Sequence, residues 1–173
     1  MTPDDLRAKI RDVPDFPKPG IVFKDIMPLL ADPETLRGTV DALADWAEPR
    51  RPDIVLGAEA RGFITGGALA CRLGCGFAAA RKPGKLPWRA VSVKYALEYG
   101  LDALEMHADA IIAGQRVLVH DDVLATGGTA RAKVDLVEQL GGVVAGVLFI
   151  IQLDFMHGDD QLEGYDVHSL IHY

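Results

Sequence analysis

The chain has 173 residues and a mass of 18.7 kDa, which suits one compact domain with a sizeable core. A composition of 49% hydrophobic and 25% charged residues excludes disordered, collagen-like and coiled-coil proteins. The net charge of −7 argues against non-specific binding to nucleic acid. No run approaches the ~20 apolar residues of a membrane-spanning helix, and the N-terminus lacks the apolar stretch of a secretory signal. We therefore expect a cytoplasmic enzyme or binding domain with neither a nucleic-acid nor a membrane partner.

The first third of the chain predicts helices separated by proline-rich breaks. A helix is expected from the N-terminus to Val13, where PDFPKPG interrupts it with three prolines and a glycine. The segment IVFKDIMPLL then forms a short apolar arm, and a second helix is expected from Asp32 to Trp46. We take residues 1–32 as an N-terminal arm and 33–173 as the core of a single domain.

From residue 53 onward, predicted strands alternate with predicted helices. We expect strands at 53–57, 76–80 and 117–119 and in VVAGVLFII. Helices are expected over 63–73 and after VLATGG, and alternation within 86–108 suggests strands or a long hairpin loop. This order predicts an α/β fold, with one mostly parallel twisted sheet flanked by helices on both faces.

The stretch VLVHDDVLATGGT, residues 117–129, is the most informative of the chain. Its strand delivers Asp121 and Asp122 to the carboxyl end of the sheet, where open α/β folds bind ligands. Gly127 and Gly128 allow a tight turn into a helix, whose free N–H groups and positive end point at the same spot. A tight connection explains a glycine pair alone, but the whole run favours a phosphate cradle beside two carboxylates. Such a site suits a sugar phosphate whose hydroxyls donate to the acids.

VHDDVLATGGT resembles the ribose-phosphate motif of the type I phosphoribosyltransferases, which use phosphoribosyl pyrophosphate. FPKPGIVFKDIMPLL, GAEARGF, RKPGKLP and YALEYG follow the order of the adenine phosphoribosyltransferases, and the resemblance extends to the closing HSLIHY. It implies a type I fold with a small base-binding hood in residues 1–32, a mobile loop at about 86–108, and a homodimer. The implied reaction is purine salvage, a Mg²⁺-dependent pentosyl transfer to adenine that gives AMP and pyrophosphate. Mg²⁺ is expected to bind mainly through substrate and water.

The resemblance assigns the phosphoribosyl group to the acid–glycine run. Asp121 and Asp122 are expected to bind the ribose hydroxyls and to take part in catalysis. The 5′-phosphate is expected on Ala125, Thr126, Gly127, Gly128 and Thr129.

The family's pyrophosphate loop matches Glu59, Ala60 and Arg61, with a cis peptide expected at Glu59–Ala60 or next to it. Arg61 offers pyrophosphate a planar fork of donors; the alternative is a surface ion pair with Glu59.

A positive patch is formed by Arg81, Lys82 and Lys85. By resemblance, all three are expected to lie among the substrate-binding residues. Arg81 and Lys85 contact pyrophosphate, and whether Lys85 does so in its own or the partner subunit stays open. The alternative is a solvated face, most of all for Lys82.

By resemblance, the base binds at Val22, Phe23 and Lys24. Phe23 is expected on one face of the purine and Val123 on the other, while backbone groups of Val22 and Lys24 read the edge. The family usually has arginine in place of Lys24, a change that a backbone contact tolerates and a bidentate side-chain contact does not.

Tyr95, Glu98 and Tyr99 fall in the loop that the resemblance describes as mobile. Its closure would exclude water from the reacting sugar. Glu98 is the candidate that exchanges a proton with the purine imidazole, and a solvent-exposed loop acid is the alternative.

Other chemistry-bearing residues carry weaker signals. His120 stands where the family usually has a valine-like residue, and the neighbouring acids would raise its pKa, although a strand histidine with satisfied hydrogen bonds is the favoured interpretation. Neither His168 and His172 nor Cys71 and Cys75 predicts a metal site, and the cysteines are expected as reduced thiols beside one helix.

Two other functions stay open at this point. One is a phosphoribosyltransferase for another purine base, which the base arm and YALEYG disfavour. The other is a regulator that senses phosphoribosyl pyrophosphate without catalysis. Such a regulator is expected to lose Glu98 or the pyrophosphate loop, or to gain a nucleic-acid-binding domain, so the enzyme is favoured.

Overall fold

A computed structural model describes residues 1–97 and 100–173. The helices are α1 (Pro3–Arg7), α2 (Met27–Ala31), α3 (Pro33–Ala47), α4 (Arg61–Leu73) and α5 (Gly128–Gln139). The strands are β1 (Arg11–Pro14), β2 (Val22–Asp25), β3 (Ile54–Ala58), β4 (Gly76–Ala80), β5 (Ala90–Leu97), β6 (Gly100–His107), β7 (Arg116–Leu124), β8 (Val143–Gln152) and β9 (Val167–His172). Short 3-10 turns are η1 (Glu48–Arg50), η2 (Asp154–Met156) and η3 (Gly158–Leu162). Within the described ranges, no helix combines the length and apolarity that a bilayer span requires.

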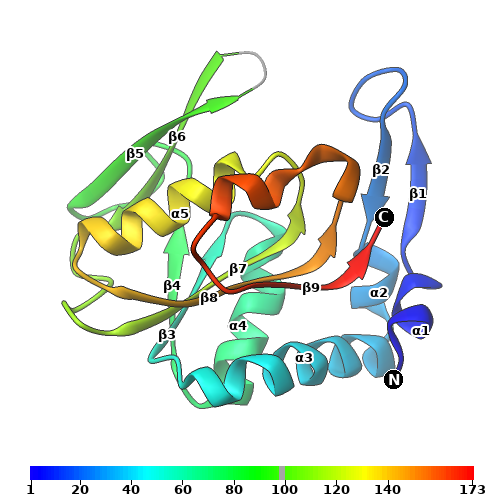
Figure 1. The fold of residues 1–173 in the computed structure, drawn as a ribbon, viewed down its shortest axis with the longest axis horizontal. Helices are drawn as coiled ribbons and strands as arrows, with labels where there is room; N and C mark the ends of the chain where they lie inside the picture. Colours follow the sequence, from blue (N-terminus) through cyan, green and yellow to red (C-terminus); the bar gives the residue numbers. More distant parts are fainter. Residues whose placement is uncertain (98–99) are drawn as a thin grey trace.

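The centre of the molecule is a parallel sheet with the strand order β4–β3–β7–β8–β9. Helix α5 covers one face, while α3 and α4 cover the other (Figure 1). The predicted parallel sheet, flanked on both faces, is therefore confirmed. The chain winds outward from β3 to β4 on one side and from β7 through β9 on the other. The carboxyl ends of β3 and β7 consequently flank a topological switch point, where open α/β sheets bind ligands.

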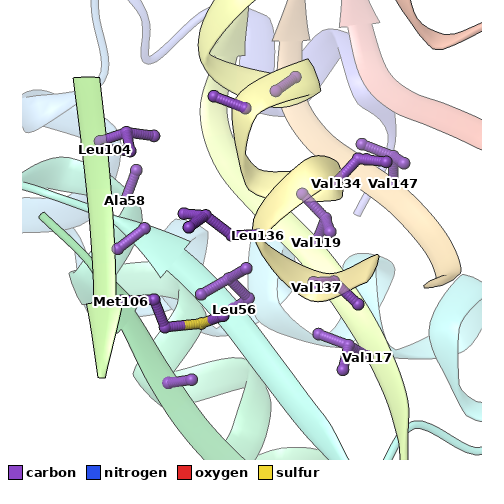
Figure 2. Close-up of a cluster of buried hydrophobic side chains, with 14 of the residues drawn as sticks. Leu56, Ala58, Leu104, Met106, Val117, Val119, Val134, Leu136, Val137 and Val147 are labelled. Carbon is purple, nitrogen blue, oxygen red and sulfur yellow. The ribbon is translucent and has the colours of Figure 1, made fainter. Parts of the chain in front are cut away.

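The core consists of two apolar layers, one on each face of this sheet. Alternate residues of one strand enter different layers, so that Leu118 packs on the α3–α4 side and Val119 on the α5 side. Figure 2 shows Val134 and Val137 of α5 close to Val119 and its neighbours. Burying an aliphatic side chain of this size stabilises the fold by about 1.5–3 kcal/mol. These layers hold the carboxyl ends of the strands in place.

Two antiparallel hairpins stand at opposite ends of the sheet, β1–β2 on one side and β5–β6 on the other (Figure 1). The predicted helix to Val13 is wrong: α1 ends at Arg7, and Val13 pairs with Phe23 in the β1–β2 hairpin. Pro14 disfavours helical backbone at Val13, and the pairing of Arg11–Pro14 with β2 makes the preceding residues a strand. The proline-rich PDFPKPG forms the turn of this hairpin.

Most other predicted bounds agree with the structure. Strand β4 covers residues 76–80 as expected, and α3 begins at Pro33 because the side chain of Asp32 accepts the N–H groups of Glu34 and Thr35. Strand β7 is longer than the predicted 117–119 and continues to Leu124. Its extension pairs with β8, a contact between distant segments that periodicity does not reveal. The acid pair therefore belongs to the strand itself.

Candidate active site

A cleft of about 450 Å³ opens at the carboxyl ends of β3 and β7, beneath the β1–β2 hairpin. It is lined by Ile21, Val22, Phe23, Lys24, Glu59, Ala60, Arg61, Asp121, Asp122, Val123, Ala125, Thr129, Leu153 and Met156. The fold thus brings together three segments that the sequence marks separately: the N-terminal arm, the turn after β3 and the acid–glycine run.

Each carboxylate of the acid pair has a cation of its own, supplied by a different helix. Asp122 forms an ion pair with Arg61, the first residue of α4. Asp121 Oδ2 lies 2.8 Å from Nζ of Lys133, which comes from α5. The N–H of Asp122 also donates to Asp121 Oδ1 at 3.0 Å. This arrangement holds two negative charges side by side at the edge of the cleft.

Burial is the largest influence on the pKa of Asp122. Burial raises the pKa of Asp122 to about 6, and the charge of Asp121 acts in the same direction, while Arg61 opposes both. Asp122 therefore keeps most of its charge at neutral pH and takes up a proton in mildly acidic solution.

The glycine run encloses a second, smaller cavity of about 70 Å³ that shares Asp121 with the main cleft. Ala125, Thr126, Gly127 and Thr129 line it, at the beginning of α5. Gly127 caps the helix with φ of 84°, a conformation that side chains disfavour. The first N–H groups of a helix have no partner within it, so this cavity suits an anion of phosphate size.

The turn after β3 contains the expected cis peptide between Glu59 and Ala60. Glu59 accepts the N–H of Lys82 at 2.6 Å and the side chains of Arg81 and Lys85 at 3.1 and 3.2 Å. Burial alone would raise the pKa of Glu59, but these donors outweigh it and the pKa is lowered. The alternative ion pair between Glu59 and Arg61 is wrong, because each has the other partners named above.

The patch after β4 divides into two parts. Arg81 and Lys85 gather at Glu59 beside the cleft. The side chain of Lys82 instead bonds Asp102 and the hydroxyl of Tyr95, both of which belong to the β5–β6 hairpin. The side chain of Lys82 is 42% exposed, so it combines a solvated face with a contact to the β5–β6 hairpin.

The arm residues Val22, Phe23 and Lys24 line the cleft together with Val123. Nζ of Lys24 lies 2.7 Å from Asp12 and 4.0 Å from the ring centre of Tyr173. The ammonium group of Lys24 is therefore already in contact with other residues of the protein. A backbone contact at this position tolerates lysine in place of arginine.

Comparison with known proteins decides the family. The phosphoribosyl transferase domain family matches residues 32–168. The adenine phosphoribosyltransferase of Rubrobacter xylanophilus is 57% identical over 169 residues, 97% of this chain and 91% of the relative. The chain belongs to the adenine phosphoribosyltransferases.

Solved structures agree with this membership. A crystal structure of the adenine phosphoribosyltransferase from Thermoanaerobacter pseudethanolicus has a TM-score of 0.97 at 49% identity, covering 99% of this chain and 100% of that one. The enzyme from Saccharomyces cerevisiae, crystallised with an imino-altritol bisphosphate and adenine, has a TM-score of 0.93 at 37% identity, covering 97% of both chains. The type I phosphoribosyltransferase fold is therefore confirmed.

His120 departs from the usual family residue and is fully buried in β7. Its Nδ1–H donates to the carbonyl of Leu148 at 3.0 Å, and the hydroxyl of Thr65 lies 2.8 Å from Nε2. The preferred interpretation, a strand histidine with satisfied hydrogen bonds, is confirmed. The expected rise in its pKa is wrong: burial lowers the pKa to about 4, against the opposite effect of Asp121.

The buried His120 makes the stability of the fold depend on pH. The unfolded chain protonates this histidine below about pH 6.5, whereas the folded chain does so only below about pH 4. The contribution of His120 to stability is therefore fully present above pH 6.5 and is lost as the pH falls toward 4.

Replacement of His120 by valine, the type usual in the family, removes this pH-dependent contribution to stability. We expect the free energy of unfolding of His120→Val minus that of the wild type to increase by about 2–3 kcal/mol as the pH falls from 7 to 4.5, measured by urea unfolding. An unchanged difference between these pH values would contradict the buried neutral imidazole.

The sequence did not predict some of the residues that line the site, and two residues that it did predict lie outside the part of the chain that the structure describes. Glu98 and Tyr99 lie outside the described residues. Leu153 and Met156 line the cleft, and the only signal for them is their position just beyond a buried strand. Lys133 was also missed, although a charged residue three positions after Ala130 on an apolar helix face is a readable signal.

Proposed function

We propose that this chain transfers the 5-phosphoribosyl group from phosphoribosyl pyrophosphate to N9 of adenine, giving AMP and pyrophosphate. The observation that carries the proposal is the acid pair: both acids line the main cleft, and Asp121 also lines the glycine-lined cavity. This order fits a nucleotide, with its base under the arm, its ribose at the acids and its phosphate at the helix. Family membership agrees with it.

Phosphoribosyl pyrophosphate would bind through three groups of contacts. The helix start and residues 125–129, including Gly128, take the 5′-phosphate. Asp121 and Asp122 accept the ribose hydroxyls. Arg61 and Arg81, together with Lys85, face the pyrophosphate, where guanidinium groups suit paired phosphate oxygens.

In the reaction the bond from C1′ to pyrophosphate breaks and a bond from C1′ to N9 forms, with inversion. Pyrophosphate leaves with the bonding electrons, and Arg61 and Arg81 stabilise its charge. The N9 proton of adenine passes to a base, a role that we propose for Glu98. Positioning supplies most of the acceleration, because no covalent enzyme intermediate is involved.

The carboxylates of the cleft fit a Mg²⁺ ion carried by the substrate. Glu59, Asp121 and Asp122 are each already paired with cationic side chains of the chain itself. These pairings favour coordination by phosphoribosyl pyrophosphate oxygens and water. When bound, Mg²⁺ would neutralise part of the pyrophosphate charge.

Adenine is proposed to lie between Phe23 and Val123, with residues 1–32 as its hood. Stacking on Phe23 suits any purine, so the backbone groups of Val22 and Lys24 must choose adenine over an oxopurine. Segment 86–108 is proposed to close over this site, since the Tyr95 hydroxyl on β5 already lies 3.4 Å from that of Thr129 in the cradle.

We further propose a cytoplasmic homodimer. Ile64 on α4 and Phe77 on the edge strand β4 are 46% and 40% exposed, an apolar surface that suits a second copy. The free thiols of Cys71 and Cys75 fit a reducing compartment.

AMP formation tests the proposal directly. Phosphoribosyl pyrophosphate and Mg²⁺ are supplied with adenine, hypoxanthine, guanine or xanthine in separate reactions. We expect turnover with adenine, at least a hundredfold above that with any oxopurine, because unpaired polar groups at the base edge cost about 3 kcal/mol or more. Turnover with an oxopurine alone would overturn the base assignment. Binding of phosphoribosyl pyrophosphate without turnover of any base would favour the alternative function, a regulator that senses phosphoribosyl pyrophosphate without catalysis.

A further inference from the structure

Lys133 is a fully buried lysine on the apolar face of α5. Its Nζ donates to the backbone carbonyl of His120 at 2.7 Å and to Oδ2 of Asp121 at 2.8 Å. A buried ammonium group is costly unless it is paired and hydrogen-bonded, so this residue needs an explanation. Both of its partners belong to the part of β7 that carries the acid pair.

Lys133 completes a set of contacts that fixes the carboxylate of Asp121. Oδ2 accepts from Lys133, and Oδ1 accepts the N–H of Asp122 at 3.0 Å. The start of α4 approaches the Asp121 carboxylate from another side, since a Cβ on Gly62 would lie 2.6 Å from Oδ1. Asp121 lines both the main cleft and the glycine-lined cavity, where the ribose is proposed to lie. Its orientation therefore decides how a sugar spans the two cavities.

The two cations of the acid pair differ in their freedom to move. The side chain of Arg61 is 38% exposed, and its proposed role is to face pyrophosphate. The side chain of Lys133 is 0% exposed and has no path to solvent. When Arg61 turns to the substrate, Lys133 remains as the counter-charge of the acids. That charge also reduces the repulsion between the carboxylates and an incoming polyanion.

We propose that Lys133 is a positioning residue for phosphoribosyl pyrophosphate, holding the Asp121 carboxylate in place and oriented toward the ribose hydroxyls from behind the site. This inference rests on the proposed function.

The pH dependence of substrate binding follows from the groups around Asp121. They are Asp122 and His120 on β7, Lys133 on α5, Arg61 on α4, and Glu59 and Lys24 across the cleft. Burial keeps His120 neutral down to about pH 4, so it contributes no charge in the working range. Removing Lys133 therefore leaves two carboxylates with Arg61 as their nearest cation, and the loss of a neighbouring positive charge favours the protonated form of a carboxyl group.

The Lys133→Met variant tests the proposal, because methionine retains much of the length and none of the charge. We expect the KM and Kd for phosphoribosyl pyrophosphate to rise about tenfold and the KM for adenine to stay unchanged. The acidic limb of kcat/KM for phosphoribosyl pyrophosphate should move up by about one pH unit, the shift typical of losing one neighbouring charge. Arg131→Met is the matched control, since Arg131 lies on the same helix and pairs with Asp135 at its surface.

A double-mutant cycle with Asp121→Asn separates positioning from simple structural support. If Lys133 acts through Asp121, Lys133→Met weakens binding in the wild-type background and adds nothing in the Asp121→Asn background. An equal loss in both backgrounds would overturn the proposal, and so would an unchanged Kd and pH limb in folded Lys133→Met.

The cycle also tests the proposal if the Lys133→Met variant fails to fold. Asp121→Asn/Lys133→Met removes the whole ion pair and leaves no buried charge unmatched. It is then compared with Asp121→Asn, and a further loss of phosphoribosyl pyrophosphate affinity, measured by calorimetry with Mg²⁺, would contradict the proposal. A wild type that binds phosphoribosyl pyrophosphate but transfers it to no base refutes the proposed function and leaves this test intact.

Discussion

The Asp122→Asn variant is expected to lose about a hundredfold in kcat/KM for phosphoribosyl pyrophosphate and to keep its KM for adenine. A hydrogen bond to a charged group contributes about 1.5–3 kcal/mol, and the upper part of this range corresponds to a hundredfold. The neutral amide also removes the charge that favours the developing positive charge at C1′. Arg61 loses its ion-pair partner in this variant, but its side chain is partly exposed and can be solvated by water.

Steady-state kinetics over pH 5–8 check this prediction. In the wild type, kcat/KM for phosphoribosyl pyrophosphate should fall below about pH 6, because Asp122 takes up a proton there. This limb should disappear in Asp122→Asn. Asp166→Asn is the control, since Asp166 pairs with Arg50 at the surface. Unchanged catalysis in Asp122→Asn would remove Asp122 from the ribose site.

The single variant is a cleaner test than replacement of both acids. Asp121→Asn also deprives the buried Lys133 of its counter-charge. Removing one partner of a buried ion pair costs about 3–5 kcal/mol, so a loss of activity in the double variant would mix chemistry with instability.

Gly127→Ala is expected to lower the free energy of unfolding by about 3 kcal/mol and to weaken phosphoribosyl pyrophosphate binding at least a hundredfold. The backbone of Gly127 has φ of 84°, which costs a side chain about 1 kcal/mol. A Cβ there would also overlap the carbonyl oxygen of Gly158 and lie 2.9 Å from Cβ of Gln161. Relieving this overlap moves the N-terminus of α5, and a displacement of about 1 Å in a binding site costs about a hundredfold.

Urea unfolding and calorimetry with phosphoribosyl pyrophosphate and Mg²⁺ measure the two effects. Gly164→Ala is the matched control, because Gly164 has φ of 91° and open space around its Cβ position. It should lose about 1 kcal/mol of stability and no affinity. Wild-type affinity in folded Gly127→Ala would show that the phosphate binds elsewhere.

Local signals made much of the fold and site predictable. Alternating apolar segments and turn residues predicted the parallel sheet, and Asp32 predicted the start of α3. The signal for the proposed binding role of residues 121–129 lies in adjacent residues, because a strand end, a glycine turn and a helix start are all local features.

Only the tertiary structure decided which residues meet the acid pair. Arg61 and Asp122 are 61 positions apart, and Leu153 reaches the cleft from beyond β8. The hairpin of β1 and β2 and the full length of β7 likewise depend on partners distant in sequence. Periodicity reports which face of an element is apolar, whereas ion pairs, burial and pKa values depend on what packs against that face. The sequence by itself therefore determined the sheet, the position of the acids and the glycine turn after them, while packing decided that His120 stays neutral and that Lys133 lies behind Asp121.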